Sequence, residues 1–309
     1  MHHQIDVTVP AAAADDLVAE LEHHDGVLAL THQRDGSVKP PGDVLSLHVL
    51  NRSVDDVLGS VGRAREHGPI TVATVRTESV VATGMQDAVE DDADESPWEE
   101  FERTLRHHGR MSTNYLALMA LGGAIAVAGL VSPPVPQALA LAASAIVAPA
   151  FEPVAKLAVA ALRGSLHRIR RALVSVVVGY LVLAASGGVA FLLLRALGMG
   201  TPEMLATSEG VHMVVDPTAA DWLVGAGGAL AGLVIVTSFR EAVLAGALIA
   251  LALVPAAALF GVGILTGDGT LALEGLQRTA ADMGLVLVLG GAVVLVKDRL
   301  HHGHRRPLA

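Results

Sequence analysis

The stretch SAIVAPAFEPVAKLAV, residues 144–159, decides how this chain can fold. It is apolar enough to lie in a bilayer, yet it contains Pro149 and Pro153 together with the charged residues Glu152 and Lys156. A proline inside a helix removes a backbone hydrogen bond, and in a membrane the freed carbonyl groups need other partners. We therefore expect a membrane helix that is broken at the two prolines and offers backbone groups to a ligand or ion.

The apolar residues are concentrated in one part of the chain. Of the 309 residues, 52% are hydrophobic, the mean hydropathy is +0.53, and residues 115–297 consist mostly of Ala, Val, Leu, Gly and Ile. Residues 1–112 are polar and acidic. This asymmetry predicts a small soluble domain followed by an α-helical polytopic membrane domain. The absence of cysteine excludes disulfides and thiolate metal sites.

The charge balance is acidic, with a formal net charge of -10 and few lysines. An acidic surface with little lysine is typical of a halophilic, salt-adapted organism such as a halophilic archaeon, although an acidic linker in a mesophile would give the same balance. The acidic linker argues against a nucleic-acid partner, which would require a basic patch.

The soluble part, residues 1–83, alternates between strand and helix patterns. Strands are predicted at 4–9, 27–33, 44–50 and 70–76, and helices at 11–24 and 53–66. The order β-α-β-β-α-β predicts a ferredoxin-like domain, a plan that often serves as a small-ligand or dimerisation module. We therefore expect a homo-oligomer. Residues 84–112 are predicted to form an acidic linker and a juxtamembrane amphipathic helix.

Six apolar stretches are each close to the ~20 residues that a helix needs to cross a hydrocarbon core of about 30 Å. They lie at residues 115–131, 135–162, 172–195, 222–238, 242–265 and 280–297. Arginine and lysine gather on one side of these spans, whereas the loops 132–137, 198–221 and 266–270 have neither. This bias predicts a multi-pass protein of the cell membrane with both termini cytoplasmic, a six-span domain over 113–298 and a basic tail over 299–309.

The spans contain landmarks that recur at an offset of about 105 residues. Pro149 corresponds to Pro255, and Ser132 corresponds to Ser238. Three spans in each copy predict two inverted repeats with proline-broken helices, an arrangement that favours a transport site near the midplane. The alternative is that paired glycines only let helices pack closely. These repeat-packing glycines are Gly122, Gly123, Gly187, Gly188, Gly227, Gly228, Gly290 and Gly291.

The candidate transport site consists of broken-helix and charged residues. We expect Pro149, Pro153 and Pro255 to open two facing breaks, with Glu152 and Lys156 beside the first. The spacing of Glu152 and Lys156 is i, i+4, so they can also form a structural ion pair near the inner leaflet. Both interpretations stay open at this point.

Three segments resemble the DUF389 family of bacterial and archaeal membrane proteins. They are GRMSTNYLALMALGGAIAVAGL, ASAIVAPAFEPVAKLAVAALRGSLHRIRRAL and SFREAVLAGALIALALVPAAALFGVGILTGDGTLAL. Pro149, Pro153 and Pro255 match the Ala-Pro-x-x-x-Pro and Val-Pro segments of that family. Glu152 departs from the Leu-Met-Gly that usually separates the first two prolines. The resemblance implies a membrane protein, and the family has no established activity.

Two functions are compatible with these patterns. The first is a transporter or channel for a small solute or ion, with a cytoplasmic regulatory or oligomerisation domain. The second is a membrane scaffold or sensor whose soluble domain binds a ligand or partner. We expect no enzyme, since hydrolase and metalloprotease motifs are absent, and we expect no cofactor and no metal.

Overall fold

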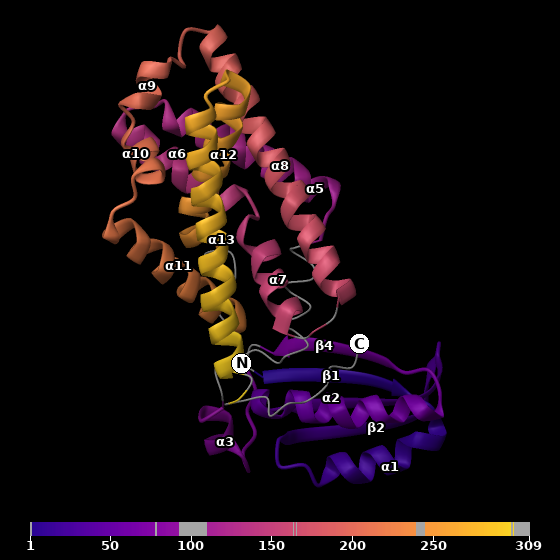
Figure 1. Cartoon of the computed structure of the whole chain (residues 1–309). Helices are drawn as coiled ribbons and strands as arrows, with labels where there is room; N and C mark the ends of the chain where they lie inside the picture. Colours follow the sequence, from indigo (N-terminus) through magenta and orange to yellow (C-terminus); the bar gives the residue numbers. More distant parts are fainter. Residues whose placement is uncertain are drawn as a thin grey trace. The chain divides into compact units, whose positions relative to one another are not determined.

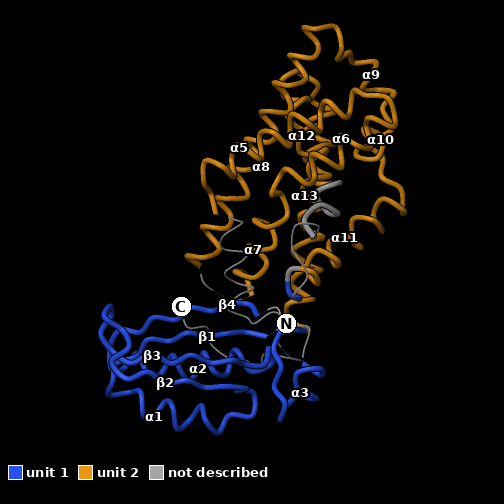
Figure 2. The backbone as a smooth tube through the Cα atoms, turned by 180° about the vertical axis from the view of Figure 1, so that it is seen from behind, with its two compact units in different colours: residues 1–102, 237–239, 297–309 blue, residues 103–236, 240–296 orange. Residues whose placement is uncertain are grey.

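The structure is a computed structural model that describes residues 2–77, 79–92, 110–162, 164, 166–238, 245–297 and 299. The chain divides into two compact units, which are coloured separately in Figure 2. Unit 1 comprises residues 1–102, 237–239 and 297–309, and unit 2 comprises residues 103–236 and 240–296. Most of the predicted juxtamembrane helix and nearly all of the predicted basic tail lie outside the described residues. The predicted domain boundaries stay predictions.

Unit 1 is built on a four-stranded sheet with two longer helices (Figure 1). Its elements are β1 (His2–Val9), α1 (Ala11–Glu22), β2 (Val27–Val38), β3 (Pro41–Val49), η1 (Asn51–Ser53), α2 (Val54–Arg63), η2 (Ala64–His67), β4 (Thr71–Thr77) and α3 (Gln86–Glu90). The strand order is β2-β3-β1-β4, and every neighbouring pair is antiparallel. This is the ferredoxin-like split βαβ topology, so the predicted order of elements is confirmed.

The core of unit 1 follows from the alternation in its strands. Ile5, Val7 and Val9 of β1 are fully buried, because every second side chain of a strand points to the same face. Leu17 and Leu21 of α1 belong to the same buried cluster. The helices therefore cover one face of the sheet, and the polar residues between these positions lie on the other face.

The buried carboxylate of Asp43 stabilises the hairpin between β2 and β3. Asp43 accepts a hydrogen bond from the backbone N–H of Asp35 over 2.9 Å and is 2.7 Å from Nε2 of His32. These two contacts hold the pKa of Asp43 below its usual value, with the backbone hydrogen bond contributing most. The ionised form of Asp43 therefore stabilises the hairpin.

Unit 2 consists of helices. They are α5 (Thr113–Leu130), α6 (Pro134–Val147), α7 (Phe151–Leu162), α8 (Leu166–Ala196), α9 (Pro202–Ala206), α10 (Glu209–Val215), α11 (Ala219–Thr237), α12 (Ala245–Thr266) and α13 (Gly269–Lys297). Among the described residues, α5, α8 and α13 are each long and apolar enough to cross a membrane. Two pairs of helices are bent at a short break, α6 with α7 by 47° and α10 with α11 by 81°. If each bent pair counts as one span, the number of candidate spans is five. Unit 2 therefore has the build of a membrane-embedded protein, and the six predicted spans stay a prediction.

The two proline segments differ in form. Residues 148–150 separate α6 from α7, as expected for the Pro149 segment. Pro255 instead lies inside α12, which continues through it as a helix. The predicted break at Pro255 is therefore wrong, because a single proline can be accommodated in a helix whose neighbours cover the freed backbone groups. The inverted repeat stays a prediction.

The paired glycines of α5 and α8 mark close helix contacts. A methyl group on Gly122 would lie 2.5 Å from the Ala148 side chain, and one on Gly123 would collide with the Leu183 carbonyl oxygen. Gly187 and Gly188 approach α12 in the same way, at Ala258 and Gly261. In the later helices, a methyl group on Gly290 would lie 2.7 Å from the Leu233 side chain, and Gly228 is buried. A methyl group on Gly227 or Gly291 would meet no atom within 4 Å. Close packing thus explains the first two pairs fully and the last two only in part.

Candidate functional site

The break between α6 and α7 is bonded by a side chain from α8. Ala148 is extended, with φ −80° and ψ 119°, and the Ala150 amide donates to the Ala148 carbonyl over 2.7 Å. The Tyr180 hydroxyl donates to the Ala150 carbonyl over 3.0 Å. A neighbouring helix therefore supplies a partner where the helix is interrupted, as backbone groups at membrane depth require.

Four of the five predicted site residues lie at this break or in the first turns of α7. Pro149 lies in the break, Pro153 is buried behind it, and Glu152 and Lys156 are partly buried. Oε2 of Glu152 is shielded from solvent. Pro255 is buried in α12, a helix that packs against both α6 and α7. The structure thus places four of the predicted residues at or just after one break, and the fifth inside an unbroken helix that packs against α6 and α7.

Two buried tyrosines surround this region. Glu152 lies near both Tyr115 and Tyr180. The Tyr115 hydroxyl donates to the Ser175 carbonyl of α8 over 2.9 Å, and it fits only because residue 179 is glycine, where a methyl group would overlap it. Polar side chains therefore line the inside of an otherwise apolar group of helices.

A buried ion pair on α13 is the second polar feature of unit 2. Nε of Arg278 donates to Oδ2 of Asp282 over 2.8 Å, and the two residues are only 5% and 2% exposed. The guanidinium lies over the ring of Trp222 from α11, 4.5 Å from its centroid, and Nη1 reaches the Met213 carbonyl of α10 over 3.4 Å. Three helices therefore hold the cation, by a carboxylate, an aromatic face and a carbonyl.

The second oxygen of Asp282 is left without a partner. Oδ1 is buried and accepts no hydrogen bond from the described residues. Gly225 of α11 lies beside it, since a methyl group added there would be 3.8 Å from Oδ1. Burying a carboxylate oxygen without a hydrogen bond is costly, so such an atom in a native protein indicates a ligand, a water or a proton.

Sequence reasoning missed this pair because it looked for the last span only at residues 280–297. The structure begins α13 at Gly269, where the side chain of Asp268 accepts from the N–H groups of Thr270 and Leu271. Arg278 therefore belongs to the helix and not to the preceding loop. The i, i+4 spacing of Arg278 and Asp282 was a usable signal, since it is the spacing that drew attention to Glu152.

Tyr180 connects the break to the ion pair. It donates to the backbone at the break, and it lies near both Glu152 and Asp282. The two features thus belong to one polar neighbourhood inside unit 2. In the part of the chain that the structure describes, no three His, Asp or Glu side chains are grouped so as to hold a metal ion.

Comparison with known families identifies the helical part. Residues 145–288 match a family model described as "Domain of unknown function (DUF389)". The chain carries a DUF389 domain. The resemblance predicted from the sequence is therefore confirmed over these residues, and the DUF389 match includes the break, Tyr180, Trp222 and the pair of Arg278 and Asp282. No curated protein and no solved structure matches the chain.

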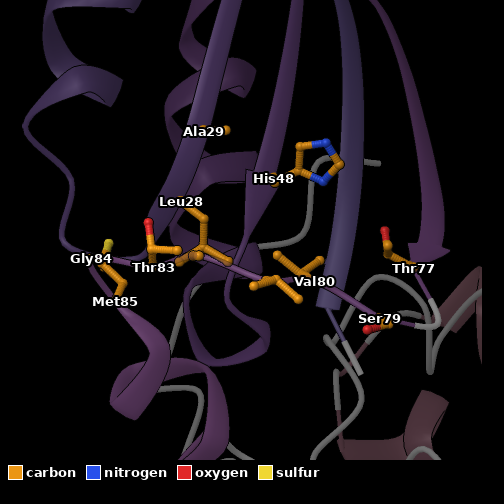
Figure 3. A pocket seen from close by; sticks show the side chains of 11 residues that line it. Leu28, Ala29, His48, Thr77, Ser79, Val80, Thr83, Gly84 and Met85 are labelled. Carbon is orange, nitrogen blue, oxygen red and sulfur yellow. The ribbon is translucent and has the colours of Figure 1, made fainter.

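The sheet of unit 1, which precedes the DUF389 match in sequence, carries an open pocket of about 500 Å³. The segment 79–85 lines it together with residues of β2, β3 and the end of β4. Figure 3 shows the His48 ring between an end formed by Thr77 and Ser79 and an end formed by Thr83 and Met85. Nδ1 of His48 is buried and has no hydrogen-bond partner among the described residues. The described lining residues carry hydroxyl, imidazole and apolar groups, which suits a small ligand of low polarity.

Proposed function

We propose that this protein moves a small solute or ion across the cell membrane through its DUF389 domain, as a multi-pass protein with both termini cytoplasmic. The observation that carries the proposal is the buried pair of Arg278 and Asp282 on α13, an apolar helix long enough to span a bilayer. Ionisable residues inside membrane spans are rare because each costs several kcal/mol to bury, and they usually line substrate or ion pathways.

The depth of the pair supports this reading. At about 1.5 Å per residue, Asp282 lies roughly 22 Å along α13 from Lys297. A hydrocarbon core is about 30 Å thick, so a helix anchored at Lys297 places Asp282 within it. The long side chain of a lysine at a helix end can extend to the interface. The short, buried side chain of Asp282 cannot.

A purely structural pair is the competing explanation. A structural pair stabilises only when its remaining donors and acceptors are satisfied as well. Asp282 retains an unsatisfied buried oxygen, which favours a working site. Tyr180 bonds to the break between α6 and α7 and lies near Asp282, which supports a polar region shared by the break and the pair.

Thiol labelling tests the proposal, because the native chain contains no cysteine. Ala150→Cys at the break and Ala258→Cys in the intact part of α12 are matched, since both alanines have zero exposure. A membrane-impermeant thiol reagent is applied from each side, with Ser132→Cys as the loop control. We expect Ala150→Cys to react and Ala258→Cys to stay unreactive. Equal labelling of the two buried positions, or of neither while the loop control reacts, would refute a water-filled path at the break.

A second function is favoured by the pocket in unit 1. There, the ferredoxin-like domain senses a small ligand of low polarity, and the membrane helices act as an anchor or oligomerisation scaffold. The buried, unpartnered Nδ1 of His48 supports it. A homo-oligomer is proposed under either function, and light scattering of the detergent-solubilised protein measures it. Protein-dependent flux in reconstituted vesicles favours transport, whereas the absence of such flux favours the sensor.

A further inference from the structure

We propose that Arg278 and Asp282 form an exchange site that takes up one small monovalent anion together with one proton. This inference rests on the proposed transport function for its use, but the site itself can be tested by binding alone. It follows from the hydrogen-bonding atom that each member of the pair leaves unused. Nη2 of Arg278 makes no hydrogen bond among the described residues, and Oδ1 of Asp282 accepts none.

Charge balance determines the class of ligand. In the structure the guanidinium and the carboxylate neutralise each other. If Asp282 binds a proton at its unpartnered oxygen, its charge disappears while that of Arg278 remains, because arginine does not lose its proton in proteins. A buried, uncompensated guanidinium is costly, so an anion must replace the carboxylate as its counter-ion. The site then holds one proton and one anion, and its net charge is unchanged.

A cation is disfavoured by the same argument. Adding a metal ion or an ammonium to the neutral pair would leave a net positive charge beside Arg278 in a low-dielectric surrounding. Trp222 holds the guanidinium in place on one side, so the cation cannot simply withdraw. The ligand must be small, since both residues are almost fully buried.

The surrounding groups leave Asp282 as the proton acceptor. Tyr180 of α8 lies near it and is an uncharged phenol at ordinary pH. Asp221, at the start of α11, interacts with Arg278 but is bonded to the Thr218 hydroxyl and N–H. Glu274 lies one turn before Arg278 on the same helix, and α10 contributes the Met213 carbonyl. Among these groups only Asp282 both pairs with Arg278 and has a buried oxygen to protonate.

The test measures anion-dependent stability of the full-length protein in detergent. Melting temperatures are compared in sodium chloride and sodium formate against sodium gluconate at equal ionic strength. Asp282→Asn mimics the protonated carboxyl and should let Arg278 bind the small anions. A tenfold excess of anion over its dissociation constant should raise the melting temperature by about 3–5 °C. Asp268→Asn, the same change at the exposed start of α13, should respond like the wild type.

Two further measurements keep the outcome decisive. The double variant Arg278→Gln/Asp282→Asn should lose the anion response. If Asp282→Asn does not fold, the wild type is compared at pH 8 and pH 5, and its response to formate and chloride should grow at the lower pH while that of Arg278→Gln should not. An Asp282→Asn response equal to that of Asp268→Asn, or an anion response that survives removal of Arg278, overturns the site.

Reconstitution separates this inference from the proposed function. Vesicles that contain the protein and a trapped pH dye are given an inward chloride or formate gradient at zero membrane potential, and protein-dependent acidification reports coupled uptake. Anion binding by Asp282→Asn without any flux in the wild type would leave the site standing and refute transport. Protein-dependent anion flux that is indifferent to Asp282→Asn would support transport and refute the exchange site.

Discussion

Replacing Arg278 with methionine should destabilise unit 2 by about 3–5 kcal/mol, the usual cost of removing one partner of a buried ion pair. The reason is specific to this site. The substitution leaves Asp282, which is 2% exposed, with both oxygens unpartnered, and it also removes the cation that lies 4.5 Å from the Trp222 ring. At about 1.4 kcal/mol for each factor of ten, the unfolding equilibrium constant should rise by roughly two to three and a half orders of magnitude.

A double variant also removes the carboxylate that Arg278→Met leaves unpaired. In Arg278→Met/Asp282→Leu the burial cost disappears with the pair, and stability should return to within about 1 kcal/mol of the wild type. Unfolding is followed by tryptophan fluorescence, in a Trp98→Phe background so that only Trp222 reports, as dodecyl sulfate is added to the protein in mild detergent. The two single variants and the double variant complete a double-mutant cycle. If the double variant is as unstable as Arg278→Met, the carboxylate is not a buried charge and the reasoning fails.

Two other predictions follow from a hydrogen-bonded carboxylate in unit 1 and a close contact in unit 2. Asp43→Asn should weaken the hairpin between β2 and β3 by about 1–3 kcal/mol above pH 4, because the bonds from the Asp35 amide and His32 to an ionised carboxylate are lost. Since these bonds lower the pKa of Asp43 in the folded state, its contribution is present above the unfolded pKa of about 3.9 and is lost as the pH falls through the lower, folded value. Hydrogen exchange of the hairpin amides at different pH values should show the two proteins converging in acid, and a constant difference down to pH 2 would contradict the assignment. Gly179→Ala should cost about 1–3 kcal/mol through overlap with the Tyr115 hydroxyl, and an unchanged melting temperature would show that this contact is loose.

The soluble fold could be predicted because its signals are local. Alternation at Ile5, Val7 and Val9 marks a half-buried strand whatever the tertiary context, and glycine and proline mark the ends of the elements. The break at Pro149 is local in the same sense, since a second proline follows four residues later. Pro255 stands alone in an apolar helix, and whether a single proline interrupts a helix depends on its neighbours, which the sequence does not reveal.

The pair of Arg278 and Asp282 could not be predicted as a site from hydrophobicity alone. Residues 269–279 are too polar to count as part of a span, so the prediction started the last helix at 280 and Arg278 was left out. Trp222 and Met213 come from helices more than fifty residues earlier, and no periodicity links them to α13. The charged pair itself was visible in the sequence, whereas the partners that hold it were not.

The order of the two charges on α13 shows what kind of site this is. Along a helix, an acid followed four residues later by a base is favoured over the reverse order, because it agrees with the helix dipole. Glu152 and Lys156 have the favoured order, which suits a pair that the helix alone can support. Arg278 and Asp282 have the reverse order, so α13 gains little from them, and their geometry depends on Trp222 and Met213 of other helices. A pair that its own helix disfavours, that three helices hold and that keeps a spare donor and a spare acceptor is better suited to exchanging partners than to fixing the fold.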